Sequence, residues 1–120
     1  MKRPIPILAV LAFLSCSPRL SPAEKVGAKN KELYREFVEE VLNKGRVDKA
    51  ADYIAAEFVD HSLPPGQTAT LAGFQAWLQE FRTAFPDGSW TVDLLIADGD
   101  TLAQHKSFFG TQKGPFAGLA

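Results

Sequence analysis

The sequence is poor in the side chains on which several classes of site depend. Among 120 residues there is a single cysteine, Cys16, and there are only two histidines, His61 and His105. One cysteine excludes an internal disulfide and a cysteine-based redox pair. One cysteine and two histidines also exclude a zinc cluster of the CxxC type, and two histidines without a third ligand do not make a metal site. We therefore expect no bound metal.

Excess positive charge and long apolar runs are also missing. The 13 basic and 14 acidic residues give a net charge of −1, so binding of nucleic acid through a basic surface is not expected. A helix that crosses a bilayer needs about 20 apolar residues, and the run from Ile5 to Leu14 is too short for that. With 46% hydrophobic and 22% charged residues, the chain has the composition of one globular domain.

Residues 1–18 have the pattern of an export signal. Two basic residues, Lys2 and Arg3, precede the apolar run, and small polar residues follow it. The segment 13–16 is similar to a bacterial lipobox, which would make Cys16 the lipidated first residue of the mature protein. Ordinary signal-peptidase cleavage after Ala23 is the alternative. We expect an exported protein, either a membrane-anchored lipoprotein or periplasmic or secreted, with residues 19–29 as a flexible tether.

Residues 30–120 contain three segments with helical periodicity. The first starts with Asn30 as N-cap and ends at Asn43-Lys44-Gly45, where glycine is free to adopt positive φ. A shorter helix follows, with Val47, Ala50, Ala51 and Ile54 on its inner face. The third helix, over 71–85, carries an aromatic stripe that predicts core packing: Phe74, Trp77, Phe81 and Phe85.

Strand patterns lie between the second and third helices and after the third. A short strand is predicted over 57–62, and a hairpin over 89–97 and 101–110 with its turn at Asp98-Gly99-Asp100. Alternation places Trp90, Val92, Leu94 and Ile96 on one face of the first hairpin strand, and Leu102, Gln104, Lys106 and Phe108 on one face of the second. This order predicts an α+β fold, with three helices on a curved antiparallel sheet that closes into a cone around a pocket.

Several short segments, in this order and spacing, carry a resemblance to a known family: Asn43-Lys44-Gly45, Phe58-Val59-Asp60-His61, Gly73, Phe85-Pro86-Asp87, Ile96-Ala97-Asp98-Gly99-Asp100 and the run from Gly110 to Gly118. Together they resemble the SnoaL-like polyketide cyclase, or ester cyclase, family of NTF2-like proteins. Two departures stand out. Gln112 occupies a position where the family usually has histidine. The family pattern also continues beyond Ala120, so the domain is expected to be C-terminally truncated, with its last strands missing.

The resemblance implies an intramolecular aldol closure in an apolar pocket, without cofactor, on a small carbonyl compound. The family's aspartate general acid/base is expected beyond Ala120, which leaves open whether this chain is an enzyme. The alternative is a non-catalytic exported NTF2-like module that binds an apolar ligand or dimerises through its sheet. A truncated copy would expose an unpaired strand edge, which favours marginal stability or a homodimer.

Five residues are candidates for the site. His61, next to Asp60 at the end of the predicted short strand, is a candidate acid/base, because imidazole as a side-chain type ordinarily titrates near neutral pH; its alternative role is to bond the following proline loop. His105 is a second candidate that faces either the pocket or the outer surface of the sheet. The candidate ligand-binding residues are Trp90, which otherwise belongs to the core, and Thr111 and Gln112, which otherwise orient a loop.

Overall fold

The computed structural model describes residues 19–119, and the predicted export signal and Cys16 lie outside them. The first helix, α1 (Pro22–Phe37), begins at Ser21 rather than at Asn30. Ser21 and Glu24 form a reciprocal capping box, and Pro22 occupies the first helical position. The flexible tether predicted over 19–29 is therefore wrong from residue 22 onward, because the Ser-Pro-Ala-Glu sequence starts a helix.

Three helical segments follow α1 in chain order. The helix continues without a break into the π-helix η1 (Val38–Asn43). Its last hydrogen bond runs from the amide N–H of Lys44 to the Glu39 carbonyl, five residues earlier. The 3-10 helix η2 (Val47–Asp52) and the helix α2 (Leu71–Ala84) complete the set. The predicted positions of the helix after Gly45 and of the aromatic helix are thus confirmed.

The predicted hairpin is also confirmed, but some of its side chains lie on the opposite face of the sheet from the one predicted. Strands β1 (Ser89–Asp98) and β2 (Thr101–Phe109) pair antiparallel, and a β-bulge at Asp93 interrupts their register. An extra residue reverses the alternation beyond it. Leu94 and Ile96 are therefore 55% and 54% exposed on the outer surface instead of sharing a face with the buried Trp90, and Leu95 turns inward.

The short strand predicted over 57–62 does not form. These residues belong to a loop between η2 and α2, in which the amide N–H of Asp60 donates to the carbonyl of Ala69. Alternation over only six residues is a weak strand signal, and in the described part of the chain β1 and β2 pair only with each other. Asp60 and His61 are consequently held by a loop and not by the sheet.

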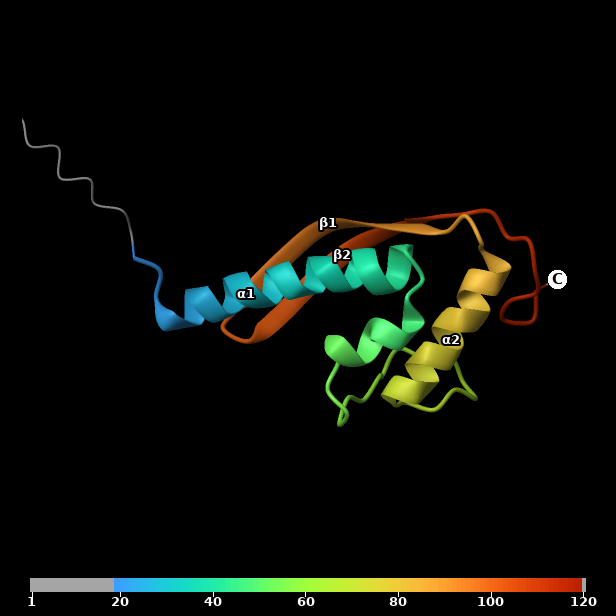
Figure 1. The fold of residues 1–120 in the computed structure, drawn as a ribbon, viewed down its shortest axis with the longest axis horizontal. Coiled ribbons are helices and arrows are strands. Elements are labelled where there is room, and N and C mark those ends of the chain that lie inside the picture. Colours follow the sequence, from blue (N-terminus) through green and yellow to red (C-terminus); the bar gives the residue numbers. More distant parts are fainter. Residues whose placement is uncertain (1–18, 120) are drawn as a thin grey trace, which may run out of the picture.

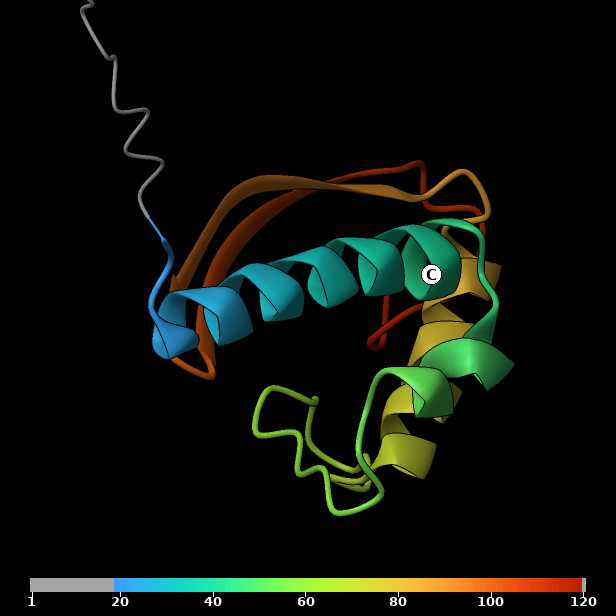
Figure 2. The same ribbon diagram turned by 60° about the vertical axis from the view of Figure 1, so that its left-hand side comes forward.

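The helices cover one face of the curved hairpin, as Figures 1 and 2 show, and the predicted α+β NTF2-like fold is confirmed. α1 runs along the concave side of the hairpin, and α2 lies across its far end. Gly27 permits the close approach at the turn, since a Cβ there would lie 2.8 Å from that of Ala97. Among residues 19–119 no helix is both long and apolar enough to span a membrane.

The core fills the angle between α1, η1, α2 and the start of the hairpin. Val41 and Leu78 are completely buried there. Next to them is an aromatic cluster centred on Phe81, whose ring lies 4.8 to 5.2 Å, centroid to centroid, from those of Trp77, Phe85, Trp90, Phe108 and Phe116. This packing fixes the far end of the hairpin against α2 and leaves the middle of α1 free to border a hollow.

Candidate functional site

A hollow of about 670 Å³ lies between α1, the loop after η2 and the inner face of β2. Its wall is mainly apolar and aromatic, with Phe37, Tyr53, Phe58 and Phe74 among the lining side chains. Polar groups enter it at a few places only: Asn30, Tyr34, Asp60, Ser62, Asp100 and Lys106. A concave apolar cavity of this size with a few convergent polar groups is typical of a small-molecule site.

Lys106 and Tyr34 form the polar centre of the hollow. Lys106 reaches inward from β2, and its Nζ lies 3.4 Å from the Tyr34 hydroxyl and 6.0 Å from the centroid of the Tyr34 ring. Both side chains are half-buried. Burial lowers the pKa of Lys106, partly offset by the negative charge of Asp60, and burial raises the pKa of Tyr34.

Asp60 is the carboxylate whose charge acts on Lys106. Its Oδ1 accepts hydrogen bonds from the amide N–H of Ser62, at 2.8 Å, and from the Ser62 hydroxyl, at 2.6 Å. Within residues 19–119 no hydrogen bond to its Oδ2 occurs. Asp100 also lines the hollow, and its backbone carbonyl accepts a hydrogen bond from the side-chain amide of Asn30.

This arrangement suits proton transfer at a carbon next to a carbonyl group. An ammonium and a phenol side by side can hold a carbonyl oxygen, and a carboxylate with an unoccupied oxygen can accept a proton. The described part of the chain brings together no group of three side chains of metal-binding type. The polar side chains that line the hollow supply acids, bases and hydrogen-bond donors.

The two predicted histidines do not reach the hollow. His61 is exposed in the loop, although its neighbours Asp60 and Ser62 line the cavity. His105 lies on the outer surface of the sheet, which is the second of its two expected positions. Its side chain is 72% exposed, and its Nδ1 lies 3.1 Å from Oδ2 of Asp93. Asp93 also accepts a hydrogen bond from Ser107, so the bulge organises a polar patch on that outer surface.

The three predicted ligand-binding residues lie away from the hollow. Trp90 is only 8% exposed and belongs to the core, where its backbone bonds to Asn43. The amide N–H of Thr111 donates to Asp87, and the Gln112 side chain donates to the Gly114 carbonyl, so both residues hold the loop after β2 in place. These placements match the alternative role expected for each residue.

Sequence reasoning missed Lys106 and Tyr34. The signal was present in the alternation of β2, in which Lys106 shares the inward face with Leu102 and Phe108. A lysine on the apolar side of a strand is uncommon, because burial disfavours its charge. Tyr34 gave no comparable signal, since a tyrosine in a helical stripe is ordinary core.

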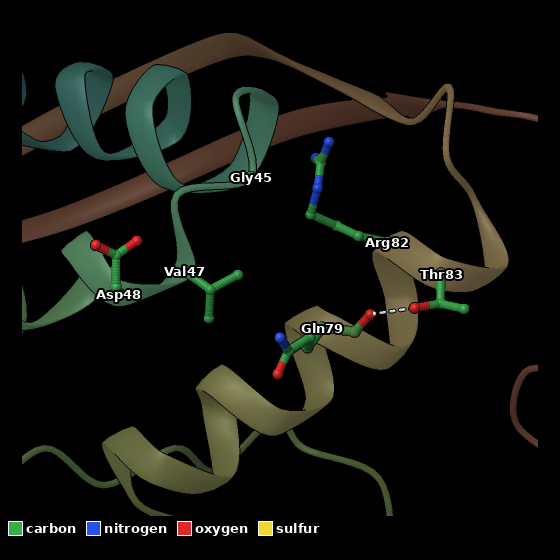
Figure 3. A pocket seen from close by; sticks show the side chains of 6 residues that line it. All are labelled: Gly45, Val47, Asp48, Gln79, Arg82 and Thr83. Atoms are coloured by element: carbon green, nitrogen blue, oxygen red, sulfur yellow. Dashed lines mark hydrogen bonds between the residues drawn. The ribbon is translucent and has the colours of Figure 1, made fainter.

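A second concavity, a groove of about 400 Å³, lies between the start of η2 and α2. Figure 3 shows Arg82 extending across it from α2 toward Gly45. Nη1 of Arg82 donates to the Leu42 carbonyl at 2.6 Å, so the guanidinium is a hydrogen-bond partner for a backbone carbonyl in the last turn of η1. Because this arginine is occupied in a structural role, the hollow beside α1 remains the better candidate site.

Three comparisons relate this fold to known proteins. The model of the SnoaL-like polyketide cyclase family matches residues 32–120. Among solved structures, a candidate polyketide cyclase from Bacillus cereus ATCC 10987 is similar, with a TM-score of 0.62 and 24% identity over 78% of this chain; the match spans 60% of that protein's length. No curated protein sequence matches. The resemblance seen in the sequence is confirmed: the chain belongs to the SnoaL-like polyketide cyclase family.

Proposed function

We propose that this chain is a cofactor-free acid/base catalyst of the polyketide cyclase type, which acts on a small carbonyl compound bound in the hollow beside α1. One observation carries the proposal. The half-buried amine of Lys106 lies against the Tyr34 hydroxyl inside a cavity whose wall is aromatic. The family membership supports the same reaction class, in which an enolate formed on one part of the substrate attacks a second carbonyl group.

Lys106 and Tyr34 hold the carbonyl oxygen in this proposal. The Lys106 ammonium donates to the Tyr34 oxygen, which leaves the phenol proton free to point at a ligand. Negative charge that develops on the substrate oxygen is then met by a cation and a hydroxyl donor in a partly dry site. Removing one such donor typically costs about 10²–10³ in rate, so either side chain is expected to matter by that amount.

Asp60 takes the proton from the carbon next to the held carbonyl. The two bonds from Ser62 to Oδ1 fix the orientation of the carboxylate, and they leave Oδ2 for the substrate. General-base catalysis by a positioned side chain contributes about 10²–10⁴ in rate. Asp100 also lines the hollow, but the carboxylate whose charge acts on Lys106 is that of Asp60.

The test is ring closure of a β-keto ester that carries an aromatic ring and a second carbonyl group, followed by chromatography and mass spectrometry. We expect closure by the unmodified chain and strong losses in Lys106→Met, Tyr34→Phe and Asp60→Asn. His105→Ala is the matched control, because His105 lies on the outer surface and should leave the rate unchanged. Thermal stabilisation by the ester without any closed product would replace the catalytic proposal with a ligand-binding module.

We propose in addition that the chain is exported and that lipid attachment at Cys16 is the mode of processing. The basic residues and apolar run of the leader support export. Helix capping supports cleavage before Cys16, because this leaves Ser21 and its capping box with Glu24 intact. Cleavage after Ala23 would remove the N-cap, at a cost of about 1 kcal/mol in helix stability.

A further inference from the structure

We infer that Lys106 forms a reversible imine with an aldehyde or ketone held in the hollow. The inference rests on the proposed function for the class of ligand, since both take a carbonyl compound at the same place. It adds a covalent step that the proposed function does not need. Hydrogen bonding to the ligand oxygen requires the ammonium form of Lys106, whereas an imine requires attack by its neutral amine.

The surroundings of Lys106 differ from those of the exposed lysines of the described chain. Three of those lysines have carboxylate partners that favour the charged form: Lys29 with Glu32, Lys44 with Glu40 and Lys49 with Asp52. Within residues 19–119, Lys106 has no carboxylate within salt-bridge distance, and its partner is the neutral phenol of Tyr34. Burial lowers the pKa of Lys106, so more of its amine is neutral near pH 7 than for a solvated lysine.

The groups around Lys106 supply what condensation requires. After the ammonium has released a proton to solvent, the Nζ lone pair attacks the carbonyl carbon and forms the C–N bond. A proton moves from nitrogen to the former carbonyl oxygen and gives a carbinolamine. A second proton, delivered from solvent through Tyr34, then protonates the hydroxyl group, which leaves as water while the nitrogen lone pair forms the C=N bond of the protonated imine. Tyr34, within hydrogen-bond distance of Nζ, is placed to pass protons between nitrogen and oxygen.

The charge of Asp60 and the aromatic wall favour the protonated imine over the free amine of Lys106. A protonated imine is a cation, and the negative charge of Asp60 already stabilises the cationic form of Lys106. Phe37, Tyr53 and Phe58 line the same cavity and offer apolar surface to the substituents of the carbonyl compound. An aryl aldehyde or an aryl ketone therefore fits the hollow better than a charged carbonyl compound.

The test is reductive trapping with benzaldehyde and sodium cyanoborohydride at neutral pH, applied to the full chain and read by peptide mass mapping. We expect one benzyl group on Lys106, added several-fold faster than on any exposed lysine. The adduct should be absent in Lys106→Arg and Lys106→Met, retained in the exposed-site control Lys113→Met, and slower in Tyr34→Phe. Circular dichroism of each variant shows whether it is folded.

Equal labelling of Lys106 and the exposed lysines in the folded protein would overturn the inference. Ring closure of the keto ester without any adduct on Lys106 would also overturn it, yet would leave the proposed function standing. An adduct without ring closure would support the imine and count against the cyclase proposal. The two proposals therefore fail separately.

Discussion

The side chain of Asn43 joins the end of η1 to the start of the hairpin, and Asn43→Ala tests how much the fold depends on this link. Its Oδ1 accepts the amide N–H of Trp90 at 2.8 Å, and its Nδ2 donates to the Trp90 carbonyl at 3.0 Å. The amide group thus pairs with both backbone groups of Trp90, as a neighbouring strand would. Both bonds are part-buried, and they join residues 47 positions apart.

The expected loss of stability follows from these two bonds. A hydrogen bond contributes about 0.5–1.5 kcal/mol net, and a buried backbone group left without a partner costs about 1–3 kcal/mol. Because the site is part-buried, water can reach it once the side chain is truncated, so the lower ends of these ranges apply. We expect Asn43→Ala to lower the free energy of unfolding by about 2–4 kcal/mol, which is a large fraction of the roughly 5–15 kcal/mol typical of a domain.

Urea unfolding followed by tryptophan fluorescence measures this loss, since Trp90 itself lies at the link. Asn30→Ala is the matched control: its single bond to the Asp100 carbonyl is long, at 3.3 Å, and exposed. If the free energy of unfolding of Asn43→Ala lay within about 0.5 kcal/mol of that of the unmodified chain, as is usual for surface substitutions, the link would not be structural.

Three further predictions concern a glycine, a carboxylate and the leader. Gly45→Ala should destabilise the chain markedly in the same urea assay, because φ is +70° and a Cβ would lie 2.3 Å from Nε of Arg82; an unchanged midpoint would contradict this. The Thr111 amide holds the pKa of Asp87 below its ordinary 3.8. This stabilisation is present above pH 3.8 and is lost as the pH falls from 3.8 through the lower pKa of the folded state. On acidification, the free energy of unfolding should therefore drop less for Asp87→Asn than for the unmodified chain. In a bacterial host, Cys16→Ser should abolish incorporation of labelled palmitate, and persistent labelling would refute lipidation at that residue.

The sequence predicted the helices and the hairpin because each has a long periodic pattern and a clear stop. Pro86 follows α2, and Asp98-Gly99-Asp100 forms the hairpin turn. It did not predict the bulge at Asp93, because apolar residues at 90, 92, 94 and 96 keep a period of two through it, and only Leu95 departs from that alternation. The start of α1 was misplaced because Ser21 and Pro22 also fit a loop, and only the capping box distinguishes the two.

The candidate site was less predictable than the fold. Histidine is the usual acid/base residue near neutral pH, which drew attention to His61 and His105. Both are exposed, because one lies in a loop and the other on the outer surface of the sheet. Lys106 becomes a candidate only when its burial and its contact with Tyr34 are known. Such contacts join residues 72 positions apart and leave little trace in local sequence.

The central claim is that a small carbonyl compound binds in the hollow beside α1, in contact with Lys106 and Tyr34. Its most direct test is a nuclear magnetic resonance titration of the chain with an aromatic β-keto ester. We predict saturable shifts at Tyr34, Tyr53 and Ile54, which line the hollow, and none at Leu94 and His105 on the outer surface. Shifts confined to the outer surface, or no saturable shift at the hollow, would contradict the claim.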